Sequence, residues 1–223
     1  MSDSSAEEAE LSLFFYECTE RTQLTHDASC AFYYCVKGFS ERSLVLLQKL
    51  FSIKEKVLDQ LNEEYGFEKL LPLERAHAKW EKKNPTGTDG EWAKAMVLEA
   101  LSQLDESEPF WTFVASRIYL HHIYEVIGKM RNLDTQHVYN HFYEQVTQLT
   151  SHGLYDNRLL QTYSNEEIVE LGICLDSERD KLFTYIGLKT LMDRYVTRNF
   201  DHSPAELPQE RWMIIAMTLM QKE

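Results

Sequence analysis

Apolar side chains that recur every three to four residues constrain the fold of this chain more than any other feature. This period places them on one face of an α-helix, so the chain is expected to be mainly α, built from amphipathic helices. The clearest sets are Val97, Ala100, Leu101 and Leu104; then Trp111, Val114, Ala115 and Ile118; then Val138, Phe142, Val146 and Leu149.

Before residue 85 the helical pattern is weaker. A helix is expected from Ser43, with the apolar face Leu47, Leu50, Phe51, Leu58 and Leu61. A short helix is expected from Pro72 to Glu81, because proline is tolerated in the first turn. Residues 30–36 are rich in aromatic side chains and fit either a strand or a buried helical turn.

Local signals mark several helix ends in the second half. Pro109 is placed to start a helix, and Gly153 to stop one. Ser164 and Glu167 have the spacing of a capping box, and Gly172 is expected to close that helix. The next helix is expected to have one apolar face, formed by Leu188, Leu191, Met192 and Tyr195.

Residues 195–223 combine a turn-rich stretch with an unusual helix. Residues 195–197 favour β structure and residues 199–204 favour turns, so a short β excursion is expected near 195–207. Pro208 then opens a helix with Glu210 in its first turn. Residues 212–217 are apolar on nearly every face, so either the rest of the chain or something outside it is expected to bury this helix.

Charge and composition narrow the class of protein. Lys and Arg total 23 against 36 Asp and Glu, a formal net charge of −13 that argues against binding nucleic acid. No apolar run is long enough for a membrane helix, and the N-terminus does not look like a secretory signal. Four cysteines are too few for a disulfide scaffold. A cytoplasmic protein without a membrane anchor is expected.

Composition also suggests four segments. Residues 1–10 are expected to be an acidic, disordered tail, and residues 11–84 a partly helical region. Proline, glycine and polar turn formers indicate a linker at 85–91, and residues 92–223 then form a helical domain.

No standard catalytic or cofactor motif is present. Three weaker constellations remain, and each is better explained as ordinary structure than as a site. They are His137, His141 and Glu144; His121, His122 and Glu125; and Cys18, His26, Cys30 and Cys35. No catalytic, cofactor-binding or metal-binding residue is therefore assigned.

Residues 155–217 carry a specific sequence signature. It includes Glu166-Glu167-Ile168, Glu178-Arg179-Asp180, Gly187-Leu188-Lys189-Thr190-Leu191, Asp193-Arg194-Tyr195 and Glu206-Leu207-Pro208-Gln209-Glu210, preceded by a related helix at residues 108–117. This region resembles the N-terminal helical segment of the large (α) subunit of class I-like ribonucleoside-diphosphate reductase. The resemblance extends over residues 92–223.

The resemblance implies a helical region that precedes the α/β barrel of an enzyme making deoxyribonucleotides for DNA synthesis. In that family, catalytic cysteines lie on the barrel, a β subunit provides a metal and radical cofactor, and nucleotides act as effectors. Residues 1–90 do not show the family's nucleotide-binding cone, and none of the four cysteines here matches the family's catalytic motifs, so no residue role is carried over.

Two functions are consistent with this resemblance. The chain is expected to be the N-terminal part of an α subunit, to support the barrel and to be inactive alone. Its partners would be the remaining α portion and the β subunit, in an assembly containing an α dimer. The alternative is a non-catalytic helical module that binds reductase subunits and regulates them.

Overall fold

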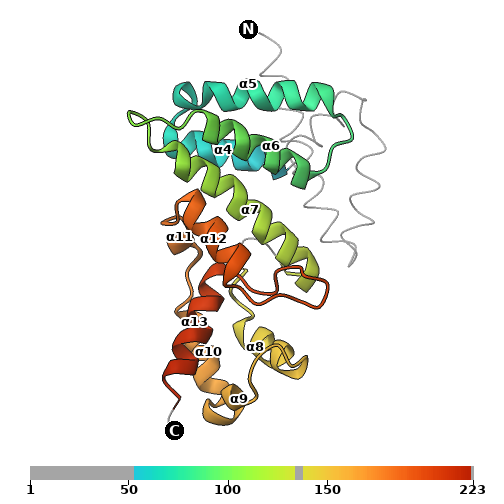
Figure 1. Ribbon diagram of the computed structural model, residues 1–223, viewed down its shortest axis with the longest axis vertical. Helices are drawn as coiled ribbons and strands as arrows, with labels where there is room; N and C mark the ends of the chain where they lie inside the picture. Colours follow the sequence, from blue (N-terminus) through green and yellow to red (C-terminus); the bar gives the residue numbers. More distant parts are fainter. Residues whose placement is uncertain (1–52, 134–137, 222–223) are drawn as a thin grey trace, which may run out of the picture. The chain divides into compact units, whose positions relative to one another are not determined.

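The computed structural model describes residues 53–133 and 138–221 (Figure 1). The chain divides into two compact units, residues 1–56 and 57–223, and nearly all described residues belong to the second. Ten helices and no strand occur among the described residues, which confirms the mainly α fold. No helix in these ranges has the length and apolar character that a membrane span requires.

The first helices are α4 (Ile53–Tyr65) and α5 (Phe67–Lys83), separated by Gly66. Gly66 has a φ of 89°, in the left-handed region that glycine adopts without a steric cost, and this residue ends α4. The predicted start of α5 at Pro72 is wrong. The helix begins at Phe67 and contains Pro72 in its interior, because the apolar face formed by Leu70 and Leu73 packs into the core from the second turn onward.

The next pair is α6 (Asp89–Ser102) and α7 (Trp111–Arg131). A capping box that the sequence analysis did not identify starts α6. The Thr88 hydroxyl accepts a hydrogen bond from the Glu91 N–H, and the Glu91 carboxylate accepts one from the Thr88 N–H. Residues 84–88 connect α5 and α6, and side chains from both helices enter one apolar cluster. A domain boundary at 85–91 stays a prediction.

Cluster 1 is the core formed by α4, α5, α6 and the first half of α7. Its largest fully buried side chains are Leu58, Leu61, Leu70, Leu73, Met96, Trp111 and Ile118. The predicted face of α7 lies here, with Trp111, Val114, Ala115 and Ile118 all nearly inaccessible. The predicted apolar set at residues 97–104 extends too far, because α6 ends at Ser102 and Leu104, beyond it, is 45% exposed.

The middle of the chain forms α8 (Phe142–Ser151), α9 (Arg158–Thr162) and α10 (Asn165–Ile173). Gly153, with a φ of 73°, follows the end of α8 as predicted, and the Ser164–Glu167 capping box starts α10. Gly172 does not close α10, because Ile173 continues the helix. A Cβ at Gly172 would lie 3.1 Å from the Phe142 Cβ, so this glycine allows α8 and α10 to pack closely.

The C-terminal helices are α11 (Ser177–Asp180), α12 (Tyr185–Arg194) and α13 (Pro208–Leu219). The predicted β excursion at 195–207 is wrong. The segment is a loop with one isolated bridge between Arg198 and Pro204. Two backbone hydrogen bonds close this loop, from the Asn199 N–H to the Ser203 carbonyl and from the Ala205 N–H to the Thr197 carbonyl. A side chain adds to them, since the Thr197 N–H donates to the Glu206 carboxylate. Tyr195, predicted to be on the apolar face of α12, is 59% exposed.

Two further clusters complete the core. Cluster 2 joins the second half of α7 to α12 and includes Ile123, Ile127, Leu188 and Leu191. Cluster 3 joins α8, α9, α10 and α13 and includes Phe142, Val146, Ile168 and Met217. Because α7 contributes side chains to clusters 1 and 2, it connects the two along its length (Figure 1).

Candidate functional site

A group of buried carboxylates fixes the start of α13, and this anchor is the most elaborate polar arrangement among the described residues. Glu210 lies in the first turn of α13, where its carboxylate accepts a hydrogen bond from the Leu207 N–H at 2.7 Å. Arg131, at the end of α7, donates to both Glu210 oxygens at 2.8 and 2.7 Å. Only 6% and 1% of the two side chains are exposed. This bidentate pair joins α7 to α13.

The second carboxylate of the anchor is Glu206, in the loop that precedes α13. Its oxygens accept hydrogen bonds from the Tyr155 hydroxyl and the Thr197 N–H, each at 2.6 Å. Arg211 supplies the positive charge, at 3.2 Å. Burial, and then the Glu206 charge, raise the pKa of Tyr155 above its usual range, so the hydroxyl keeps its proton and acts as a donor.

The third carboxylate, Asp180, ends α11 and has no cationic partner within salt-bridge distance among the described residues. It accepts hydrogen bonds from the hydroxyls of Tyr124 and Tyr139 at 2.5 Å each. Gln209, in the first turn of α13, donates a third at 2.9 Å. Burial raises the pKa of this carboxyl, although the three donors act in the opposite direction. Asp180 therefore links α7 and α11 to α13.

The polar groups of the anchor hold the start of α13 in place and are not arranged for catalysis. Each carboxylate already accepts hydrogen bonds from buried donors, and the tyrosine hydroxyls are donors whose pKa values are raised by burial. Such groups are neither free bases nor activated nucleophiles. Arg131 and Gln145 also donate to the Ala205 carbonyl at 2.6 and 2.7 Å, so the backbone leading into α13 is fixed as well.

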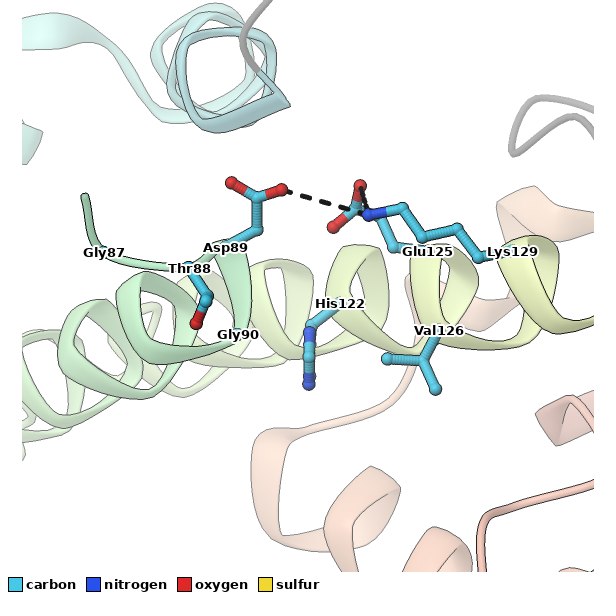
Figure 2. A pocket seen from close by; sticks show the side chains of 8 residues that line it. All are labelled: Gly87, Thr88, Asp89, Gly90, His122, Glu125, Val126 and Lys129. Carbon is cyan, nitrogen blue, oxygen red and sulfur yellow. Dashed lines mark ion pairs between the residues drawn. The ribbon is translucent and has the colours of Figure 1, made fainter.

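A pocket of about 440 Å³ lies where the start of α6 meets the second half of α7 (Figure 2). Gly87, Thr88, Asp89 and Gly90 form one wall, and His122, Glu125, Val126 and Lys129 form the other. Figure 2 shows Asp89 and Glu125 both reaching the Lys129 ammonium, at 4.0 and 3.2 Å. The cation is shared by two carboxylates, which leaves little positive charge to attract an anionic ligand.

The structure separates the predicted constellation of His121, His122 and Glu125. His122 and Glu125 line the pocket together, whereas His121 is close to Arg117 and Lys181 instead. Burial lowers the pKa of His122, and burial with the two nearby cations lowers that of His121 to about 4. Both imidazoles are therefore neutral at pH 7 and do not act as a pair.

The other two predicted constellations are only partly described. His141 precedes α8 and its Nδ1 lies 3.9 Å from a Glu144 oxygen, with both side chains more than half exposed. His137 lies outside the described residues, as do Cys18, His26, Cys30 and Cys35.

Sequence reasoning missed the anchor as a site. The sequence places Asp180, Glu206 and Glu210 only in a family signature or at a helix end, and no motif in it singles out Arg131. The sequence does contain a signal for the ion pair. Arg131 lies one turn beyond Ile127 in a strongly apolar helix, and two glutamates, Glu206 and Glu210, flank the Leu-Pro pair that starts the last helix.

Part of the anchor lies in a region that matches a known protein family. Residues 181–223, which contain Glu206, Gln209 and Glu210, match the family model described as the ribonucleotide reductase all-alpha domain. The chain is similar to ribonucleoside-diphosphate reductase α subunits. This confirms the resemblance seen in the sequence, and it lies over the N-terminal part of those subunits.

Three relatives show the extent of the similarity. The chain is 33% identical over 137 residues to the ribonucleoside-diphosphate reductase α subunit of Helicobacter pylori, which covers 61% of this chain and 16% of the relative. For the same subunit of Treponema pallidum the identity is 34%, with the same coverage. For the ribonucleoside-diphosphate reductase 1 α subunit of Escherichia coli it is 24% over 111 residues, 48% of this chain and 13% of the relative. The matched region thus spans about a sixth of the length of these reductase α subunits.

Proposed function

We propose that this chain is the N-terminal, helical part of a ribonucleoside-diphosphate reductase α subunit and supports the catalytic barrel without catalysing the reaction itself. The observation that carries the proposal is that the family match at residues 181–223 coincides with the segment that the buried anchor holds in place. A scaffold needs a rigid connection of this kind, because the groups it supports must keep their geometry.

The described residues fit a supporting role better than a catalytic one. Cys174 is the one cysteine among them, and it is exposed directly after α10. Reduction of a ribonucleotide in this family needs a cysteine pair on the barrel, so this chemistry is assigned to the remaining α portion. We assign the metal and radical cofactor to the β subunit, and the reaction to the cytoplasm in an assembly containing an α dimer.

Reconstitution tests the proposal directly. The 223-residue chain is expressed together with the remaining α portion from the same source, the β subunit is added, and reduction of ribonucleoside diphosphates is measured. Activity is expected only when all three are present. A mixture that assembles, as shown by size-exclusion chromatography, and still reduces no ribonucleotide would contradict the proposal.

A further inference from the structure

Helix α13 has two apolar faces, and only one is covered. Ile214 and Met217 are 4% and 2% exposed and pack into cluster 3. Trp212 and Leu219 are 51% and 78% exposed, and they are seven residues apart, which places them on the same side of the helix. Ile215 lies between them. These three residues are called the outer stripe.

The outer stripe is uncharged and rigidly presented. Residues 212–220 contain no charged side chain, an unusual composition for an exposed helix surface. The anchor fixes the first turn of α13, and the Tyr163 hydroxyl donates to the Met217 carbonyl at 2.9 Å near the other end. An apolar surface that is held in one orientation is typical of a binding interface, because binding then needs little further ordering.

The length of the relatives supports one occupant for this stripe. The similarity lies over the N-terminal part of the reductase α subunits and accounts for 16% of the Helicobacter pylori subunit, so most of the polypeptide follows the matched region. Since the stripe is apolar, its partner must offer apolar side chains.

We propose that the outer stripe of α13 docks against the α-subunit polypeptide that follows this region. This inference rests on the proposed function and names the surface through which support is given. It assigns the central contact to Trp212, since tryptophan is enriched among the residues that carry most of the free energy of an interface, and Leu219 extends the apolar contact along the helix.

Photo-cross-linking tests the assignment. A photo-cross-linking amino acid replaces Trp212 in the full chain, which is expressed with the remaining α portion and irradiated, and mass spectrometry locates the linked peptide. The matched control places the same amino acid at Leu98, which is 68% exposed on α6. Position 212 is expected to link to the polypeptide that follows, and position 98 is not. Links only to a second copy of this chain, or none, would overturn the inference.

Substitutions give an independent measurement. Leu219→Lys is expected to weaken association with the remaining α portion by about tenfold or more, because an ammonium group would be buried in the interface. Leu98→Lys should leave association unchanged. Thermal unfolding of both variants checks that the chain itself stays folded. If Leu219→Lys folds and associates as well as the unsubstituted chain, the stripe is not the contact surface.

The two proposals fail in different ways. Ribonucleotide reduction without any cross-link from position 212 would remove the docking surface and leave the proposed function intact. A cross-link from position 212 in an assembly that reduces no ribonucleotide would remove the proposed function and leave the contact. The absence of both association and reduction removes both.

Discussion

At the scale of single residues, the molecule depends on charged groups placed where water does not reach. A surface ion pair contributes little to stability, whereas removing one partner of a buried pair leaves an unpaired charge in an apolar environment. Arg131 and Glu210 are of the second kind. Arg158 and Asp156 form a pair of the first kind. Their guanidinium and carboxylate groups lie 2.7 Å apart and the side chains are 70% and 47% exposed, so this pair can be compared directly with the buried one.

Replacing Arg131 tests this difference. Arg131→Met should lower the free energy of unfolding by about 3 to 5 kcal/mol, because the Glu210 carboxylate loses its cation while staying buried. Arg158→Met should lower it far less, because both members of its ion pair are exposed to solvent. Denaturant unfolding followed by circular dichroism measures both. Equal effects of the two substitutions would show that the buried pair does not anchor α13.

The raised pKa of Asp180 predicts how its contribution depends on pH. A carboxyl whose pKa is higher in the folded than in the unfolded protein binds more protons when folded, so its contribution to stability falls as pH rises above its usual value of 3.8. Asp180→Asn removes this dependence. Relative to the unsubstituted chain, the variant should therefore gain stability as pH rises above 3.8.

Asp201→Asn is the matched control for Asp180→Asn. Asp201 is exposed, and hydrogen bonds from Ser203 lower the pKa of its carboxyl, so its contribution is present at neutral pH and is lost on acidification. Relative to the unsubstituted chain, its variant should lose stability as pH rises toward 3.8, which is the opposite sign and a lower pH range. Urea unfolding at a series of pH values measures both slopes. A pH-independent difference for Asp180→Asn would contradict the prediction.

At the scale of elements, the sequence predicts the helix ends that are set by neighbouring residues and misses the features that are set by tertiary contacts. The Ser164–Glu167 capping box and the glycine after α8 are local, and both predictions are confirmed. The start of α5 and the loop at 195–207 depend on distant side chains. Residues 195–197 favour a strand, yet the buried Glu206 carboxylate takes the Thr197 N–H that a strand would use.

Capping provides the prediction at this scale. Ser164→Ala should destabilise α10 by about 1 kcal/mol, because the Glu167 N–H loses its acceptor. Ser151→Ala is the control: this exposed hydroxyl donates to the Gln148 carbonyl at the end of α8 and caps no N-terminus, so the change should stay within about 0.5 kcal/mol. Hydrogen exchange at the first amides of α10 reports the effect, and unchanged protection there would contradict it.

At the scale of the whole molecule, periodicity reveals helices but not how they are joined. The apolar faces of α7 and α8 were readable, and they are buried as predicted. The anchor was not readable as a site, because Arg131 meets Glu210 across 79 residues and sequence spacing carries no record of such a contact. The sequence also did not indicate which half of α13 is exposed. A helix that is apolar on nearly every face is expected to be buried, but its composition does not say which face the rest of this chain covers.

The continuity of the clusters predicts that residues 57–223 unfold as one cooperative unit. Side chains of α7 belong to clusters 1 and 2, and Leu175 packs against clusters 2 and 3, so loss of one cluster removes neighbours from the next. Leu73→Ala, a cavity in cluster 1, should cost about 2 to 5 kcal/mol. Leu98→Ala, at an exposed position of α6, should cost less than about 0.5 kcal/mol.

Hydrogen exchange distinguishes cooperative from local unfolding in these variants. If the clusters unfold together, Leu73→Ala lowers the protection of slowly exchanging amides in α12 and α13 by the same free energy as in α5. If the clusters were independent, the loss would be confined to the helices of cluster 1. A cooperative unit matters for the proposed function, because a support transmits its rigidity to the outer stripe only when the helices behind that stripe do not open separately.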